Sequence, residues 1–267
     1  MSAPGTIVIR DIESLAEMRE VEQLQREIWG VEDLEVYPAL ALKPQKEVGA
    51  ILIGAFAEGR LVGFVFGFPG ILNGETIIHS DMLGISAAYR SQNLGYLLKR
   101  AQREAALALG VKLITWTFDP LQSPNAHLNF SKLGVIADRY YVDYYGVTSS
   151  FLHRFGTDRL WVTWLLESER VKSRLEQNAS PVAADLIHSE DIVIEIPREI
   201  TSNHEHWRLT TREAFTRALD AGYVVEEFFV SENTGRYILR PDPGFPRKSG
   251  AKNVLQSTRH RASRASS

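Results

Sequence analysis

Cysteine is absent from this chain of 267 residues. Disulfide bonds, thiolate zinc sites and cysteine nucleophiles are therefore excluded. Long apolar runs are also missing, since no stretch approaches the roughly 20 residues that a membrane-spanning helix needs. The first residues, MSAPGTIVIR, lack the charged and then apolar layout of a secretory signal peptide. We therefore expect a cytoplasmic protein without membrane contact.

Charge is distributed unevenly along an otherwise ordinary soluble composition, with 44% hydrophobic and 24% charged residues. Residues 247–267 hold six Lys or Arg and no Asp or Glu, so residues 1–246 carry a net charge of −9 within a total of −3. The basic segment is rich in Ser and Ala, and we interpret residues 241–267 as a disordered tail. A nucleic-acid or partner-binding arm is the alternative; we expect a solvated terminus and no nucleic-acid partner.

Strand and helix patterns alternate over the first 146 residues. Ser14 and Glu17 form a capping box before the first helical pattern, and Gly110 follows the second pattern as a C-cap. The predicted order is a strand at 6–10, a helix from 15, strands at 50–57, 61–68 and 76–85, a helix at 94–109, a strand at 112–118, a helix at 125–133 and a strand within 135–145.

A polar stretch, Arg90-Ser91-Gln92-Asn93-Leu94-Gly95, stands between a predicted strand and a predicted helix. The first amides of a helix have no partner within the helix, and together with the helix dipole they favour a pyrophosphate. Gly95 permits close approach to the backbone, and Arg90 can add charge. An ordinary strand-to-helix turn would give the same pattern, so the loop alone leaves both interpretations open.

This loop resembles the acetyl-CoA-binding motif of the GNAT N-acetyltransferase superfamily, whose pattern is Arg/Gln-x-x-Gly-x-Gly/Ala. Asn93 replaces the first glycine, and Asn is the non-glycine residue that best tolerates left-handed backbone angles. The predicted order over residues 6–146 is also similar to that family, as is NAHLNFSKLG at 125–134. The longer string ITWTFDPLQSPNAHLNFSKLG resembles an uncharacterised subgroup with a C-terminal extension, and this likeness implies no substrate.

The resemblance implies an α/β (α+β) fold with a central, mixed but mostly antiparallel sheet flanked by helices. It divides the chain into an acetyltransferase domain at 1–146, an α/β extension at 147–240 that could cover the acceptor site, and the tail at 241–267. It also implies acetyl-CoA (coenzyme A) as co-substrate, no metal, and direct transfer without a covalent enzyme intermediate. The cofactor-binding residues carried over are Leu83, Gly84, Ile85, Arg90, Ser91, Gln92, Asn93, Leu94, Gly95, Tyr96 and Asn125.

In that family the strand before the loop splays from its neighbour, and the pantetheine amides pair with the freed backbone. Residues 82–85 occupy this place here, and the N–H of Leu83 is the candidate group to polarise the thioester carbonyl. Asn125 contacts the cofactor arm through its amide or, as an equal alternative, only caps its helix.

Acetyl transfer also needs a neutral amine and a proton for the leaving thiolate. The family often places a Tyr acid where this chain has Phe130, which has no proton to donate. A tyrosine of the run RYYVDYYG, with Tyr141 as the candidate, would replace it, unless these tyrosines only pack on a strand surface. Glu75, His79 and Asp81 alternate and share one strand face, so they are candidate bases acting through water, or else a solvated face or a salt-linked pair.

The second half contains α/β patterns without a second phosphate loop. Trp161 and Trp164 either line an acceptor pocket or belong to the core. The predicted strands lie at 160–166, 191–196, 223–230 and 235–240, with an amphipathic helix at 204–221 and a linker at 167–190.

These features predict an acetyl-CoA-dependent N-acetyltransferase that acts on the amine of a small molecule. One alternative is a catalytically impaired acyl-CoA-binding sensor or scaffold, which Phe130 and Asn93 favour. Another is a transferase of a longer acyl group, which would need a wider tunnel beside Leu83 and Phe130. Homodimer formation is left open.

Overall fold

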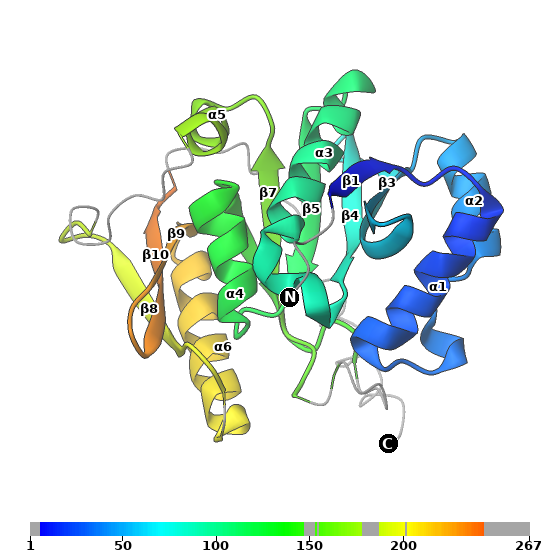
Figure 1. Cartoon of the computed structure of the whole chain (residues 1–267). Helices are drawn as coiled ribbons and strands as arrows, with labels where there is room; N and C mark the ends of the chain where they lie inside the picture. The colour runs from blue at the N-terminus through cyan, green and yellow to red at the C-terminus, as the bar shows by residue number, and fades with distance from the viewer. Residues whose placement is uncertain (1–5, 147–152, 154, 178–186, 201, 243–267) are drawn as a thin grey trace, which may run out of the picture.

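The structure is a computed structural model that describes residues 6–146, 153, 155–177, 187–200 and 202–242. Within these residues a single ten-stranded sheet has the order β1-β2-β3-β4-β5-β7-β6-β9-β10-β8 (Figure 1). Its strands are β1 (Ile7–Asp11), β2 (Ile51–Ala57), β3 (Arg60–Leu72), β4 (Glu75–Ile85), β5 (Leu113–Phe118), β6 (Ile136–Tyr141), β7 (Arg159–Leu165), β8 (Ile192–Pro197), β9 (Tyr223–Val230) and β10 (Thr234–Pro241).

Helices cover both faces of this sheet. None of those in the described part of the chain is long and apolar enough to cross a membrane. The helices are α1 (Leu15–Trp29), α2 (Ala39–Glu47), α3 (Leu94–Ala108), α4 (Ser123–Ala126), α5 (Glu169–Gln177) and α6 (His204–Asp220), with short helical turns η1 (Asp33–Glu35), η2 (Ala87–Gln92) and η3 (His127–Lys132).

The sheet is antiparallel except between β4 and β5. These two parallel strands pair at Ile78 with Ile114 and at His79 with Thr115. Past His79, β4 continues to Ile85 along β3. The two strands therefore splay where β4 approaches the polar loop. This mixed, mostly antiparallel sheet and the order of its strands and helices confirm the fold class that the resemblance implies.

Two hydrophobic clusters lie on opposite faces of the sheet. One cluster, which includes Met18, Leu42 and Phe64, lies under α1 and α2. Figure 1 shows these two helices on one side of the first strands. The other cluster runs under α3, η3 and α6 and continues from Ile78 to Phe215. Among the described residues, α1 packs mainly on β3, β4 and α2, and neither α1 nor α2 makes a comparably extensive contact with β5, β7 or β6.

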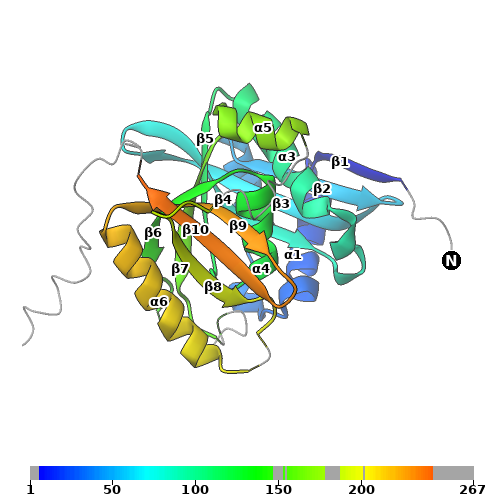
Figure 2. The same cartoon turned by 90° about the vertical axis from the view of Figure 1, so that its left-hand side faces the viewer.

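The sheet runs across residue 146 without a break. Strand β7 follows β6 in the chain but lies between β5 and β6. Strands β9, β10 and β8 then extend the same sheet and are covered by α6 (Figure 2). The division at 146 stays a prediction, and the arrangement of the strands gives it no visible boundary. Of the predicted tail at 241–267, all but residues 241 and 242 lie outside the described residues.

Three helices differ from the sequence prediction. One is α5, Glu169–Gln177, which lies within the predicted linker at 167–190. Helix α2 was not expected, because Pro44 lies inside it and proline removes a helical hydrogen bond. It forms because its buried residues Ala39 and Leu42 pack on the core. The helix predicted at 125–133 begins earlier, at Ser123, and widens into the π-helix η3. Such a widened turn adds one residue and leaves little trace in hydrophobic periodicity.

Candidate active site

The polar loop enters α3 through a residue in a left-handed conformation. Asn93 has φ 58°, in the left-handed region, so the asparagine takes the conformation for which it was expected to substitute for glycine. The first bond within α3 runs from the Leu97 N–H to the Asn93 carbonyl at 3.2 Å. The amides of Leu94, Gly95 and Tyr96 precede that bond and have no carbonyl within the helix to bind. The side chains of Leu94 and Tyr96 are buried in the core, whereas Gly95 has no side chain.

Gly95 lies against the splayed part of β4. A Cβ atom added to Gly95 would meet Ile85 at 3.4 Å, Leu128 at 3.5 Å and Leu83 at 3.8 Å, which are ordinary contacts. The folded chain would therefore tolerate a small side chain here. The space that this side chain would fill lies between β4 and η3, where a ligand could approach the helix amides.

Backbone groups on β4 alternate in direction. The Ser86 N–H donates to the Val62 carbonyl at 2.9 Å, and the register pairs Gly84 with Phe64. Since hydrogen-bonded and non-bonded pairs alternate in an antiparallel ladder, Gly84 directs its backbone groups to β3, whereas Leu83 and Ile85 direct theirs away from it. The Leu83 N–H thus points to the side where β4 and β5 splay.

Gly84 has a packing role. A Cβ atom there would lie 3.0 Å from both Ile28 and Phe64 and 3.4 Å from Trp29. A glycine at this position therefore lets α1 pack closely on β4. Close packing alone explains why residue 84 is a glycine. The role of Gly84 in cofactor binding stays a prediction.

Cationic side chains accompany the loop. Arg90 donates from Nε to the Ile85 carbonyl at 3.3 Å. Lys132 of η3 donates to Asn93 Oδ1 at 2.8 Å, which brings a second cation to the loop. The sequence analysis did not include Lys132, because nothing in the spacing of residues 93 and 132 indicates that they meet. Ser86 also donates to Glu27 at 2.6 Å, which attaches the start of the loop to α1.

The half-buried face of the sheet at β7 carries the other candidates. Residues of β7 alternate between buried and half-buried, and Arg159, Trp161 and Thr163 are on the half-buried side. The Trp161 ring lies 5.1 Å from the His79 ring and 6.2 Å from the Tyr141 ring. Three strands that are distant in sequence therefore bring a base candidate, an acid candidate and a tryptophan together. We call the set His79, Asp81, Tyr141, Tyr144 and Trp161 the acceptor face.

Asp81 occupies a β-bulge. The register pairs Gly67 with Ser80 and Phe66 with Met82, which leaves Asp81 as the extra residue on β4. A bulge turns a side chain out of the regular alternation. Asp81 is exposed, yet its surroundings desolvate the carboxylate enough to raise its pKa.

His79 is neutral near pH 7. Burial, followed by the nearby Lys99, lowers the pKa of His79 to about 4. Its Nδ1 lies 3.0 Å from the Thr115 hydroxyl, and its ring also contacts Phe68 at 5.6 Å. The imidazole is therefore fixed on two sides and able to accept a proton, although it is a weaker base than a free histidine.

The tyrosines after β6 form a ring cluster. Tyr141 and Tyr144 are 5.2 Å apart, and Tyr144 and Tyr145 are 4.9 Å apart. The pKa of Tyr144 is raised, first by burial and then by neighbours that include Tyr141 and Asp81. Tyr140 points to the opposite face, where it stacks on Phe215 at 5.5 Å.

Several residues weighed in the sequence analysis lie elsewhere. Phe130 is fully buried, with its ring 6.1 Å from Phe118 and 5.7 Å from Tyr237, so it belongs to the core. Trp164 is also fully buried, which separates it from Trp161. Asn125 is exposed inside the first turn of α4, whose N-cap is Gln122, so the interpretation that Asn125 caps this helix is wrong.

Lys99 is a buried lysine that sequence analysis missed. It donates to Ser80 Oγ and to Gln102 Oε1, both at 2.9 Å, and its Nζ lies 3.6 Å over the Trp116 ring. Burial lowers the pKa of Lys99 well below its ordinary value. In sequence it is one polar residue of an amphipathic helix, and only the packing of α3 on β4 places it beneath the bulge.

No group of three His, Cys, Asp or Glu residues placed to hold a metal ion occurs in the part of the chain that the structure describes. The arrangement instead joins a phosphate-type loop, a splayed strand with outward backbone groups, and a face of titratable side chains.

Solved structures with a similar fold are acetyltransferases. They include the ribosomal-protein-S18-alanine N-acetyltransferase from Escherichia coli, at 12% identity over 61% of this chain and 96% of that chain, with a TM-score of 0.48. An aminoglycoside 6'-acetyltransferase type Ii matches at 17% identity over 61% and 99%, with a TM-score of 0.49. The NatC complex bound to Gag peptide and CoA matches at 12% over 60% and 98%, with a TM-score of 0.48. At these values the likeness is one of fold and decides neither cofactor nor substrate.

No family model matches the sequence. No curated protein matches it either.

Proposed function

We propose that this chain is an N-acetyltransferase that transfers the acetyl group of acetyl-CoA directly to the amine of a small molecule. The observation that carries the proposal is the splay of β4 from β5. On this one strand, the outward backbone of Leu83 lies between the phosphate-type loop at its end and the bulged Asp81.

The loop and the splayed strand would hold the cofactor. The amides of Leu94, Gly95 and Tyr96 and the positive end of the α3 dipole suit the pyrophosphate, with Arg90 and Lys132 as cations beside it. The Leu83 N–H would donate to the thioester carbonyl oxygen, where negative charge develops. Acetyl-CoA would supply the activated acyl group. The residues of this chain would bind the cofactor and transfer the protons.

The acceptor face would handle the protons. Asp81 has a raised pKa, so its carboxylate is a better base than an ordinary aspartate, and neutral His79 can pass a proton through water. Tyr141 is the candidate to protonate the leaving thiolate, since Phe130 lies in the core. The small amine would lie against Trp161 and the tyrosines.

A second candidate is acyl-CoA binding without turnover. Phe130 lies in the core and has no acidic proton, so the position at which the family often has a Tyr acid supplies none here. This favours binding without turnover. Transfer of a longer acyl group stays a third possibility, which a comparison of acetyl-CoA with longer acyl-CoAs would test.

Calorimetric titration with acetyl-CoA, and with desulfo-CoA as a non-reactive ligand, tests the cofactor site. Gly95→Trp should abolish binding by filling the space beside the helix amides, and Arg90→Ala should weaken it. Leu109→Trp is the matched control, because Leu109 is exposed at the opposite end of α3. Equal affinity in wild type and Gly95→Trp would contradict the assignment.

Thiol release with a panel of small amines then separates the two candidates. Turnover with an amine supports the transferase. Tight binding of acetyl-CoA together with no amine turnover would favour the sensor.

A further inference from the structure

Asp158, immediately before β7, is a fully buried carboxylate with several partners. Its Oδ2 accepts from the Tyr140 hydroxyl at 2.7 Å and its Oδ1 accepts from the Asp143 N–H at 3.0 Å. Arg212 of α6 donates to the same two oxygens at 2.9 and 2.8 Å. A buried carboxylate needs such compensation, because removing one partner leaves an unpaired charge in the interior.

These contacts hold the turn at residues 142–146, which follows Tyr141. Asp143 has φ 48°, a left-handed conformation that is strained for a non-glycine residue. Its N–H is held by Asp158, and its carboxylate lies 3.2 Å from Arg212. The next amide, that of Tyr144, donates to the Thr157 carbonyl at 3.0 Å. The strained turn thus depends on partners outside itself.

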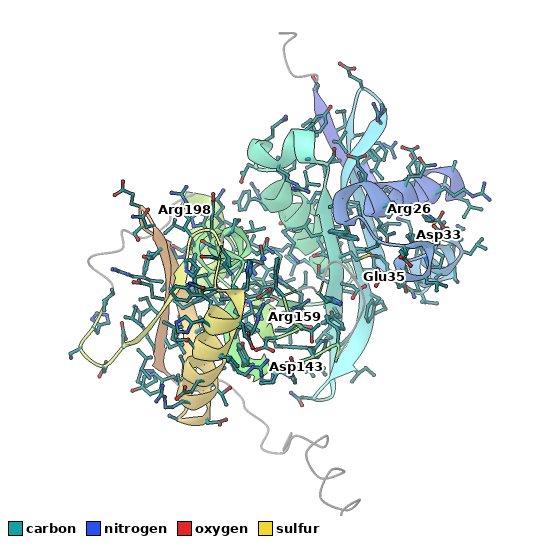
Figure 3. All side chains as sticks on the ribbon, turned by 90° about the horizontal axis from the view of Figure 1, so that it is seen from below. Arg26, Asp33, Glu35, Asp143, Arg159 and Arg198 are labelled. Atoms are coloured by element: carbon teal, nitrogen blue, oxygen red, sulfur yellow. The ribbon has the colours of Figure 1, made fainter. Side chains whose placement is uncertain are left out.

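The guanidinium in this network comes from the C-terminal part of the chain. Figure 3 shows Asp143 beside α6, with Arg159 at the start of β7 close by. Helix α6 is itself fixed there, because Arg208 binds Asp119 through two bonds of 2.8 Å and Phe215 stacks on Tyr140. The position of Arg212 is therefore set by tertiary packing.

We propose that Arg212 is a positioning residue for acetyl transfer: through Asp158 and Asp143 it fixes the turn 142–146 and thereby places Tyr144 on the acceptor face, beside Tyr141 at the end of β6. This proposal rests on the proposed function. It gives the C-terminal part of the chain a specific task, namely to brace the acceptor face without contacting the substrate.

Arg212→Ala, Arg212→Lys and Arg174→Ala test it. Arg174 is the control, because it binds the buried Glu227 at 2.7 Å in the same part of the chain and does not contact the turn. We expect Arg212→Ala to raise the KM for the amine about tenfold and to leave the KM for acetyl-CoA within about twofold. Arg212→Lys should recover part of the loss, and Arg174→Ala should leave both KM values unchanged.

Hydrogen exchange of a peptide covering residues 140–146 provides a readout without turnover. Its amides should exchange faster in Arg212→Ala and at the wild-type rate in Arg174→Ala. Unchanged exchange, or equal changes in both KM values, would overturn the positioning role, and Arg212→Lys decides the question if Arg212→Ala does not fold. A wild-type chain that acetylates no amine would overturn the proposed function, while exchange would still decide whether Arg212 fixes the turn.

Discussion

The polar loop and the acceptor face are built in opposite ways. Loop residues 86–95 are contiguous, and their expected contacts with a pyrophosphate are mostly made by backbone amides. The acceptor face is assembled from β4, β7 and the segment around the end of β6, and it acts through side chains. A site made of backbone in one segment tolerates a substitution such as Asn93 for glycine. A site made of side chains from several segments depends on the register of every strand.

The largest effect is expected at the bulge of β4. Asp81→Asn should lower kcat/KM for the amine about 100-fold, because an amide cannot accept the proton, and should leave acetyl-CoA affinity unchanged. The measurement is steady-state thiol release together with calorimetry. Glu75→Gln is the control, since Glu75 is exposed at the other end of β4. Similar losses in both variants would show that Asp81 acts only as a surface charge.

A second prediction concerns the stability cost of burying Lys99 beneath the β4 bulge. Lys99→Met should raise the free energy of unfolding by about 1–3 kcal/mol near pH 7, because it removes a buried ammonium. The folded-state pKa lies below that of the unfolded chain, so the wild-type stability should rise with pH up to about 10.5, and this rise should be smaller in the variant. Urea unfolding measures the free energy of unfolding and its dependence on pH. Arg100→Met, at an exposed neighbour, should change stability little, and a destabilised Lys99→Met would refute the expectation.

The loop cations should matter less than Asp81. Lys132→Gln should weaken acetyl-CoA binding about five- to tenfold, because it removes one charge-assisted contact. The loss should shrink at high salt, where exposed charges are screened. Calorimetry at two salt concentrations measures it, with Lys112→Gln as a control at an exposed lysine beyond the opposite end of α3. An equal effect of both substitutions would indicate a general charge effect.

The smallest expected effect is a pH dependence from His79. The folded-state pKa of about 4 lies below the ordinary value of 6.5, so stability should be complete above pH 6.5 and fall as the pH drops toward 4. His79→Gln should remove about 1 kcal/mol of this dependence, less than the full shift implies because the ring is half-buried. Thermal unfolding between pH 4 and 7 measures it. His206→Gln, at an exposed histidine, should retain the wild-type profile.

Local patterns predicted the first part of the fold well. Ser14 accepts from the Glu17 N–H at 3.2 Å, and Glu17 accepts in return, as the capping box predicts, because all the atoms lie within one turn. Asn93 takes the left-handed conformation for a similarly local reason. Helix α2 was missed because Pro44 hides its pattern, and its stability comes from packing on the core.

The amino-acid sequence by itself determined most of the order of strands and helices, the polar loop and the identities of the titratable candidates, because these depend on neighbours within a few residues. Tertiary structure alone decided that β7 enters the sheet between β5 and β6, that Trp161 meets His79, and that Arg212 reaches Asp158. These contacts depend on strand register and on the packing of segments distant in the chain. No local periodicity carries that information.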